Sequence, residues 1–257
     1  MGIRVGLTAV APLCAILTFT LATPSYAEDA PSVEDLRDLS IEELANLPVT
    51  SVSKSAQPLS EAPASIYVIS ADDIARSGAR TIPEMLRLAP NLFVARINPS
   101  DYVITARGFS TSFGAQNFSN KLLVLIDGRS VYNPLFSGMY WDLQDVPPEN
   151  IDRIEVISGP GATLWGANAV NGVVNIITRA ASETQGGIVS LGAGNLRSSA
   201  SVQYGGKLSE DASYRAYVKT FYENAFDMTN GLSADDGWSK PQAGFRVDWK
   251  PGGEALT

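Results

Sequence analysis

The sequence contains no histidine, and its single cysteine, Cys14, lies close to the N-terminus. Without histidine the chain lacks the commonest general base and the commonest side-chain ligand of transition metals. Without a later cysteine it also lacks a disulfide, a thiolate metal site and a thiol nucleophile over most of its length. These absences exclude most hydrolytic triads and most zinc sites. The sequence therefore predicts no catalytic residue, no metal site and no cofactor.

Long apolar runs and basic clusters are also missing beyond the first 27 residues. The longest apolar run there, residues 122–126, is too short for a transmembrane helix. The net charge is -8 and no basic run is interleaved with aromatic residues, so a nucleic-acid partner is not expected. If the chain enters a membrane, it must do so as strands that close into a barrel.

The first 27 residues have the order of an export signal. One positive charge at Arg4 precedes an apolar stretch over residues 5–21, and small residues follow up to Ala27. This order predicts a signal peptide at residues 1–27 that is cleaved after Ala27. A membrane anchor is the alternative, but polar residues and a proline interrupt the stretch and no charged stop-transfer flank follows.

Two further regions precede a change of pattern near residue 181. Residues 28–58 predict an N-terminal segment without a core of its own, acidic and weakly helical up to residue 47, with a short helix that ends near Asn46, and polar, β-prone and extended from residue 49. Residues 59–180 predict one small α+β domain, a mixed sheet with short helices. Its expected strands cover residues 65–69, 102–107, 122–126, 154–157 and 173–177, and its expected helices lie near residues 72–77 and 82–88.

From residue 181 to residue 257 apolar and polar side chains alternate in several long runs, of which residues 214–223 are the clearest. One face of such strands suits lipid and the other a wet lumen, as in a transmembrane β-barrel. A soluble antiparallel sandwich also alternates and is the alternative. About four strands cannot close a membrane barrel, which needs at least about eight, so we expect the first strands of an incomplete barrel in a fragment.

Residues 153–179 read RIEVISGPGATLWGANAVNGVVNIITR. This stretch resembles the signature that closes the plug domain of TonB-dependent outer-membrane receptors. The Arg107-Gly-Phe motif, the run at residues 122–129 and the strand and helices that begin at Ala64 are similar to the same family in order and spacing. The resemblance implies a plug domain followed by barrel strands, in a receptor of the cell outer membrane.

That resemblance also implies a function, the energy-coupled uptake of a scarce nutrient such as a ferric siderophore, haem or cobalamin. The expected partners are TonB, outer-membrane lipid and a small-molecule or metal-chelate substrate. The alternative is a passive outer-membrane porin or adhesin with a plug-like insert. A periplasmic enzyme is disfavoured by the absence of histidine and of a later cysteine, although a carboxylate hydrolase is not strictly excluded.

The stretch ahead of the plug is similar to the family's TonB box, the segment that TonB grasps. A β-prone, exposed segment can add as a strand to such a partner, and the alternative of a disordered linker is compatible with this role because a linker is what TonB must grasp. The predicted coupling residues are Leu47, Pro48, Val49, Thr50, Ser51 and Val52.

The resemblance assigns two further groups of residues. Arg107 and Arg153 match the plug arginines that pair with acids of the barrel in this family. Loops that point outward from the plug would touch substrate, and their aromatic residues either stack on a planar ligand or pack against the barrel wall. The predicted substrate-facing residues are Asn98, Phe113, Tyr132, Phe136, Tyr140 and Trp141.

Overall fold

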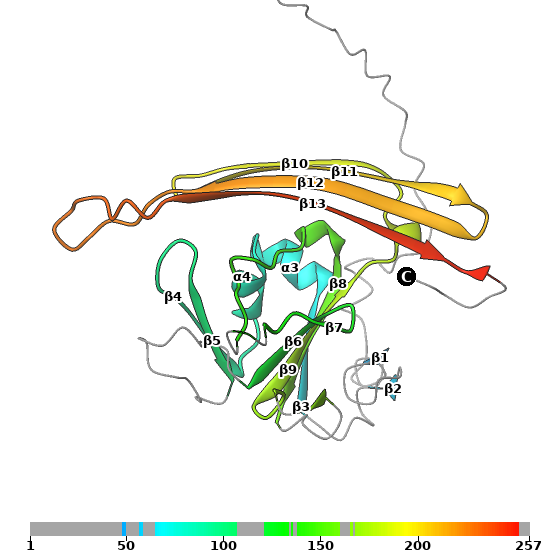
Figure 1. The fold of residues 1–257 in the computed structure, drawn as a ribbon, viewed down its shortest axis with the longest axis horizontal. Coiled ribbons are helices and arrows are strands. Elements are labelled where there is room, and N and C mark those ends of the chain that lie inside the picture. Colours follow the sequence, from blue (N-terminus) through cyan, green and yellow to red (C-terminus); the bar gives the residue numbers. More distant parts are fainter. Residues whose placement is uncertain are drawn as a thin grey trace, which may run out of the picture. The chain divides into compact units, whose positions relative to one another are not determined.

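The computed structural model describes residues 48–49, 57–58, 65–106, 121–133, 135, 138–159, 165–166 and 168–251. The chain divides into two compact units, Met1–Asp38 and Leu39–Thr257, and every described residue belongs to the second. The predicted export signal therefore lies outside the described residues. Figure 1 shows the two parts of the second unit that matter for function, a mixed α+β domain and a long antiparallel sheet.

The mixed domain is built on a five-stranded sheet in the order β3-β8-β9-β6-β7. The β6 and β9 strands pair in parallel, and the other neighbours are antiparallel. Both parallel strands are almost continuously apolar because the sheet is covered on both faces there. The strands are β3 (Ser65–Ser70), β6 (Leu122–Ile126), β7 (Arg129–Ser130), β8 (Ile151–Ser158) and β9 (Gly172–Thr178).

Two short helices, α3 (Ala71–Ser77) and α4 (Ile82–Leu86), supply apolar side chains to the main core. Side chains alternate across each strand, so Leu122 and Val124 enter this core while Leu123 and Leu125 enter a smaller one. The buried residues of both clusters come only from the mixed domain. The 3-10 turn η2 (Pro148–Asn150) leads into β8.

A hairpin of β4 (Leu92–Arg96) and β5 (Tyr102–Ala106) extends from the same domain and ends in a tip at residues 97–101. The sequence predicts β5 but not β4, and the expected helix at residues 82–88 ends two residues earlier in the structure. A separate two-residue pairing joins β1 (Pro48–Val49) to β2 (Gln57–Pro58).

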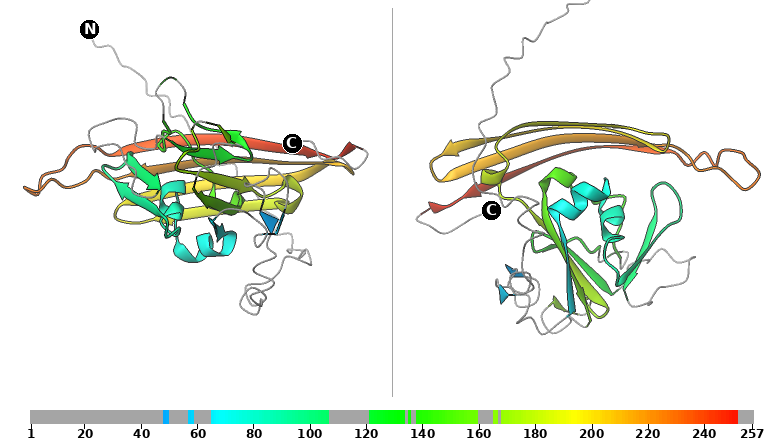
Figure 2. Two further views of the ribbon diagram at one scale, coloured as in Figure 1. Left: turned by 90° about the horizontal axis from the view of Figure 1, so that it is seen from below. Right: turned by 180° about the vertical axis from the view of Figure 1, so that it is seen from behind.

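The antiparallel sheet, which we call the wall, has the order β10-β11-β12-β13. Its strands are β10 (Gly186–Ala193), β11 (Arg197–Ser209), β12 (Ala212–Glu223) and β13 (Trp238–Trp249), and the 3-10 turn η3 (Ala181–Glu183) leads into them. Both views in Figure 2 show these strands running alongside the mixed domain.

Burial on the wall is the reverse of burial in a soluble sheet. The apolar side chains of Val202, Val218 and Phe245 are exposed, whereas the charged side chains of Lys219 and Glu223 are buried. A soluble sandwich buries its apolar face, so this alternative is excluded. An apolar outer face and a polar inner face are the pattern of a transmembrane β-barrel wall.

Within the described residues, no helix is both long enough and apolar enough to cross a membrane.

Candidate functional site

The polar face of the wall contacts the mixed domain through charged side chains in three places. The central contact joins Asp145, in the loop before η2, to Lys219 of β12, with 2.7 Å between Oδ2 and Nζ. Their side chains are 6 % and 8 % exposed. Beside them, Lys240 donates to the carbonyl of Asp142 and Gln242 to the carbonyl of Asp145, both at 2.8 Å. These two bonds go to backbone carbonyls, and within the described residues neither Asp145 carboxylate oxygen makes a hydrogen bond, so the buried carboxylate depends on the charge of Lys219.

A second contact fixes the chain where it passes from β9 into the wall. Arg246 of β13 donates to the Thr178 hydroxyl at 2.7 Å and pairs with Asp248 at 2.9 Å. Asp248 in turn accepts from the N–H of Ala181 at 2.6 Å. Arg215 of β12 donates to the carbonyl of Arg179 at 2.9 Å. The connection between the mixed domain and the wall is therefore held by side chains of two wall strands.

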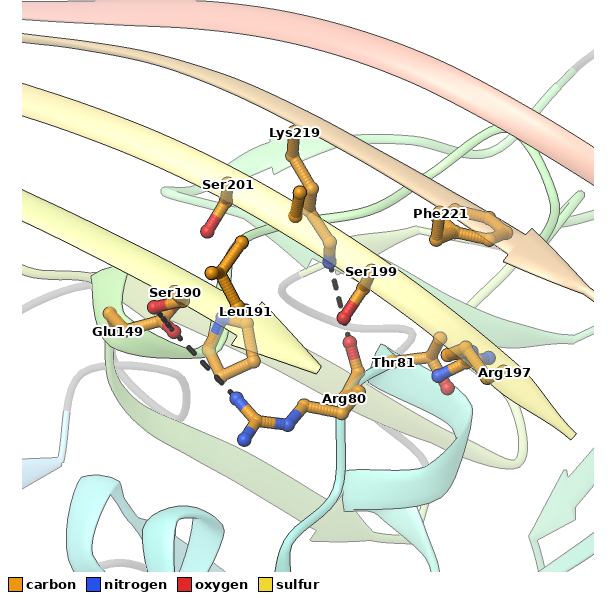
Figure 3. Close-up of a pocket in the computed structure, with 12 residues that line it drawn as sticks. Arg80, Thr81, Glu149, Ser190, Leu191, Arg197, Ser199, Ser201, Lys219 and Phe221 are labelled. Atoms are coloured by element: carbon orange, nitrogen blue, oxygen red, sulfur yellow. Dashed lines mark hydrogen bonds and ion pairs between the residues drawn. The ribbon is translucent and has the colours of Figure 1, made fainter. Parts of the chain in front are cut away.

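A small cavity lies where the chain between α3 and α4 faces the wall (Figure 3). Glu149 accepts from the Ser190 hydroxyl at 2.7 Å and pairs with Arg80 at 3.7 Å. Lys219 also donates to the carbonyl of Arg80 at 3.4 Å, so one lysine serves both this segment and Asp145. Leu191 and Phe221 also line the cavity, so its surface is partly apolar.

The third contact surrounds Glu223 at the end of β12, whose side chain is only 2 % exposed. Its carboxylate pairs with Arg96 of β4 and with Arg197 of β11. Arg197 also approaches Glu84 of α4 at 3.4 Å. None of these four residues was predicted from the sequence as a site residue. Their only signal in the sequence is that Arg197 and Glu223 occupy polar positions of alternating strands.

Of the two arginines predicted to contact the barrel, the structure describes only Arg153. Arg107 lies outside the described residues. Arg153 pairs with Asp152 at 2.6 Å and with the fully buried Glu155 at 2.9 Å, both within β8. Both of these partners belong to the mixed domain, and a contact between Arg153 and the barrel stays a prediction.

The predicted coupling segment is only partly described, since Leu47, Thr50, Ser51 and Val52 lie outside the described residues. Pro48 and Val49 form β1 and pair with Pro58 and Gln57. The Val49 side chain is fully buried. The predicted exposure is therefore wrong at Val49, because an apolar β-branched residue beside a second extended segment gains more from burial than from remaining in water.

Of the residues predicted to face substrate, Asn98 lies at the hairpin tip, where its carboxamide organises the turn. Trp141 is 6 % exposed and packs in the main core, so its ring offers no open face for stacking. Tyr132 packs against the smaller core and Tyr140 is half-buried. Phe113 and Phe136 lie outside the described residues. Ligand contact by the other predicted aromatic residues stays a prediction.

Comparison with known proteins identifies the mixed domain. Residues 58–173 match the sequence profile described as the TonB-dependent Receptor Plug Domain. This match places the mixed domain in the plug family of TonB-dependent receptors. The mixed domain is accordingly the plug, and the expected plug followed by antiparallel strands is confirmed.

The relatives are transporters and receptors rather than enzymes. The chain is 35 % identical over 148 residues to the vitamin B12 transporter BtuB of Vibrio vulnificus, covering 57 % of this chain and 23 % of that protein. It is 33 % identical over 176 residues to the rhizobactin receptor of Rhizobium meliloti, covering 67 % of this chain and 21 % of that protein. The chain therefore spans less than a quarter of the length of either relative.

Among solved structures, the fold is similar to that of the pyoverdine outer membrane receptor FpvA of Pseudomonas aeruginosa. The TM-score is 0.59 at 20 % identity, covering 79 % of this chain and 27 % of that one. At this identity the likeness concerns the fold alone.

Proposed function

We propose that this chain provides the plug and first wall strands of a receptor for energy-coupled uptake of a scarce nutrient across the outer membrane. The observation that carries the proposal is that the plug packs on the polar face of the wall, while the apolar side chains of the wall are exposed. Buried ion pairs hold the two together, above all the pair of Lys219 and Asp145. A plug held in this way blocks a barrel lumen at rest. When the plug moves away from the wall, water can solvate the separated charges, which offsets part of the lost attraction.

The source of work is the second part of the proposal. The outer membrane has no nucleotide supply and no maintained ion gradient, so a partner that spans the periplasm must do the work. We assign that role to TonB, which would add a strand to the segment at residues 47–52. Because Val49 is buried and β1 already pairs with β2, this pairing must open before TonB can bind.

The substrate is proposed as a metal chelate or corrinoid, such as a ferric siderophore, haem or cobalamin. The relatives named for vitamin B12 and rhizobactin support this class without choosing within it. The hairpin tip around Asn98 is the part of the plug that we assign to ligand contact. It meets the end of the wall where β12 leads into the long connection to β13.

The test is uptake by cells that express the full-length receptor in place of their own, with and without TonB. Radiolabelled cyanocobalamin and a panel of radiolabelled ferric siderophores and haem are supplied below micromolar concentration. We expect one ligand to bind in both strains and to accumulate only with TonB. Accumulation that is equal in the two strains would indicate a passive porin, and binding without accumulation in either strain would indicate an adhesin.

A further inference from the structure

The hairpin tip at residues 97–101 is a compact turn organised by one side chain. Asn98 Oδ1 accepts from the N–H groups of Ser100 and Asp101 at 2.9 and 2.8 Å, and Ile97 N–H donates to the Asp101 carbonyl at 2.9 Å. These amides are protected only while the turn keeps this conformation. Contacts that hold the turn in this conformation from its base therefore also slow the exchange of these amides.

Arg96, at the base of the tip, connects the turn to the wall. Its Nε donates to the Asn98 carbonyl at 3.2 Å and its Nη2 to the Pro99 carbonyl at 2.8 Å. The same Nη2 pairs with Glu223 of β12. Trp238 of β13 donates to the same Pro99 carbonyl at 3.0 Å. Two wall strands thus hold one peptide of the plug, one directly and one through Arg96.

Glu223 connects this tip to a second part of the plug. Its other oxygen pairs with Arg197, which lies 3.4 Å from Glu84 Oε2. That Glu84 oxygen accepts from the N–H groups of Arg80 and Thr81 at 2.9 and 3.3 Å, at the start of α4. The hairpin tip and the first turn of α4 are therefore joined through only three intervening side chains.

Aromatic rings fix the orientation of both guanidinium groups. Arg96 lies over the rings of Tyr102 and Phe226, at 5.5 and 5.0 Å from their centroids, and Arg197 lies over Phe221 at 5.5 Å. Both arginine side chains are only 15 % exposed. Stacking of this kind restricts a guanidinium to one plane and favours a carboxylate in that plane.

We propose that Glu223 is a positioning residue that sets the hairpin tip against the wall and couples its position to the start of α4. The cluster of Arg96, Glu223, Arg197 and Glu84 carries two positive and two negative charges, so it is neutral while complete. Removing the Glu223 charge leaves two buried guanidinium groups facing the same space, and they repel each other. Arg96 then releases the tip, and Arg197 competes with the amides of Arg80 and Thr81 for Glu84.

This role deepens the proposed function and rests on it in one respect, the assignment of the tip to ligand contact. A ligand that displaces the tip would change the contacts of Glu84 through Glu223 and Arg197. The physical coupling itself requires neither ligand nor TonB. It can therefore be tested in the ligand-free receptor, and its failure would leave the uptake proposal untouched.

The experiment is hydrogen exchange by mass spectrometry on the purified, ligand-free full-length receptor in detergent. In Glu223→Gln, exchange at residues 97–101 and at Arg80 and Thr81 should be faster by about tenfold or more, the effect of losing one charge-assisted hydrogen bond. Exchange in β6 should not change. Glu223→Asp, which keeps the charge, should restore much of the protection at both places.

Asp248→Asn is the matched control, because Asp248 is a buried wall carboxylate that also pairs with an arginine. It should affect the chain near Ala181 and leave the tip unchanged. Unchanged exchange at the tip in Glu223→Gln overturns the proposal, and a change at the tip without one at Arg80 and Thr81 overturns the coupling. If Glu223→Gln does not insert into the membrane, Arg96→Lys tests the same prediction by removing the planar fork while keeping the charge.

Discussion

Lys219 of the wall and Asp145 of the plug form an ion pair of 2.7 Å in which each side chain is less than a tenth exposed. Neither charge has free access to water, so each depends on the other for compensation. The pair lies among hydrogen bonds from Lys240 and Gln242 to the same plug loop. This loop is therefore the part of the plug that the wall holds most directly.

Removal of one partner of this pair should loosen the plug, while removal of both should be milder. Lys219→Met should destabilise the contact by about 3–5 kcal/mol, because it leaves the Asp145 carboxylate buried without its lysine. Lys219→Met combined with Asp145→Leu should recover most of that loss. The measurement is the entry of a large antibiotic, normally excluded, into cells expressing each receptor. Equal entry in the single and double variants would show that the pair is not coupled.

The plug should fold without the wall. Its two hydrophobic clusters contain only plug residues, and the wall contacts it through polar side chains. Residues 59–180 expressed alone should therefore give a soluble monomer with one cooperative thermal transition of modest stability. Aggregated protein without a transition in several buffers would mean that the wall is needed for folding.

The start of α3 should make this domain sensitive to acid. Burial tends to raise the pKa of Asp73, but hydrogen bonds from the Ser70 hydroxyl and N–H and from Arg76 outweigh it and lower the pKa overall. The folded-state pKa is then below the unfolded one. This contribution to stability is complete above the unfolded pKa and is lost as the pH falls through the folded pKa.

Asp73→Asn should remove that part of the acid dependence and cost about 1 kcal/mol or less at neutral pH, since the carboxylate is partly exposed. Denaturant unfolding of the isolated plug between neutral and acidic pH checks this. Asp72→Asn is the control, because it removes the same charge from the same turn and leaves the bonds between Ser70 and Asp73 in place. An identical pH profile for Asp73→Asn and the wild type would contradict the assignment.

The positions of the plug strands β6 and β9 were predictable because both are almost wholly apolar, and that of β8 because apolar residues recur along it. The wall was predictable because its side chains alternate over long strands, as in β12. The hairpin strand β4 was missed because it is short and only half-buried. Trp141 was assigned to a substrate loop because nothing local distinguishes a core aromatic from an exposed one.

The charged contacts could not have been predicted from local pattern. Arg96 and Glu223 are 127 residues apart in the sequence, and Arg197 and Glu84 are 113 apart. No spacing rule connects such positions, and they meet only because the wall folds back along the plug. The pairing of Val49 is of the same kind, since its partner strand at Gln57 is not marked in the sequence.

Coupling through Val49 is the central claim, and one paired measurement tests it most directly. Val49→Pro removes the backbone N–H that a TonB strand would need and also breaks the resting pair with Gln57, whereas Val49→Thr keeps both. Ligand bound to whole cells and ligand accumulated inside them are measured for both variants of the full-length receptor. We predict that Val49→Pro binds normally but accumulates no ligand, and that Val49→Thr does both. Full accumulation by Val49→Pro would contradict the account and place the TonB contact elsewhere.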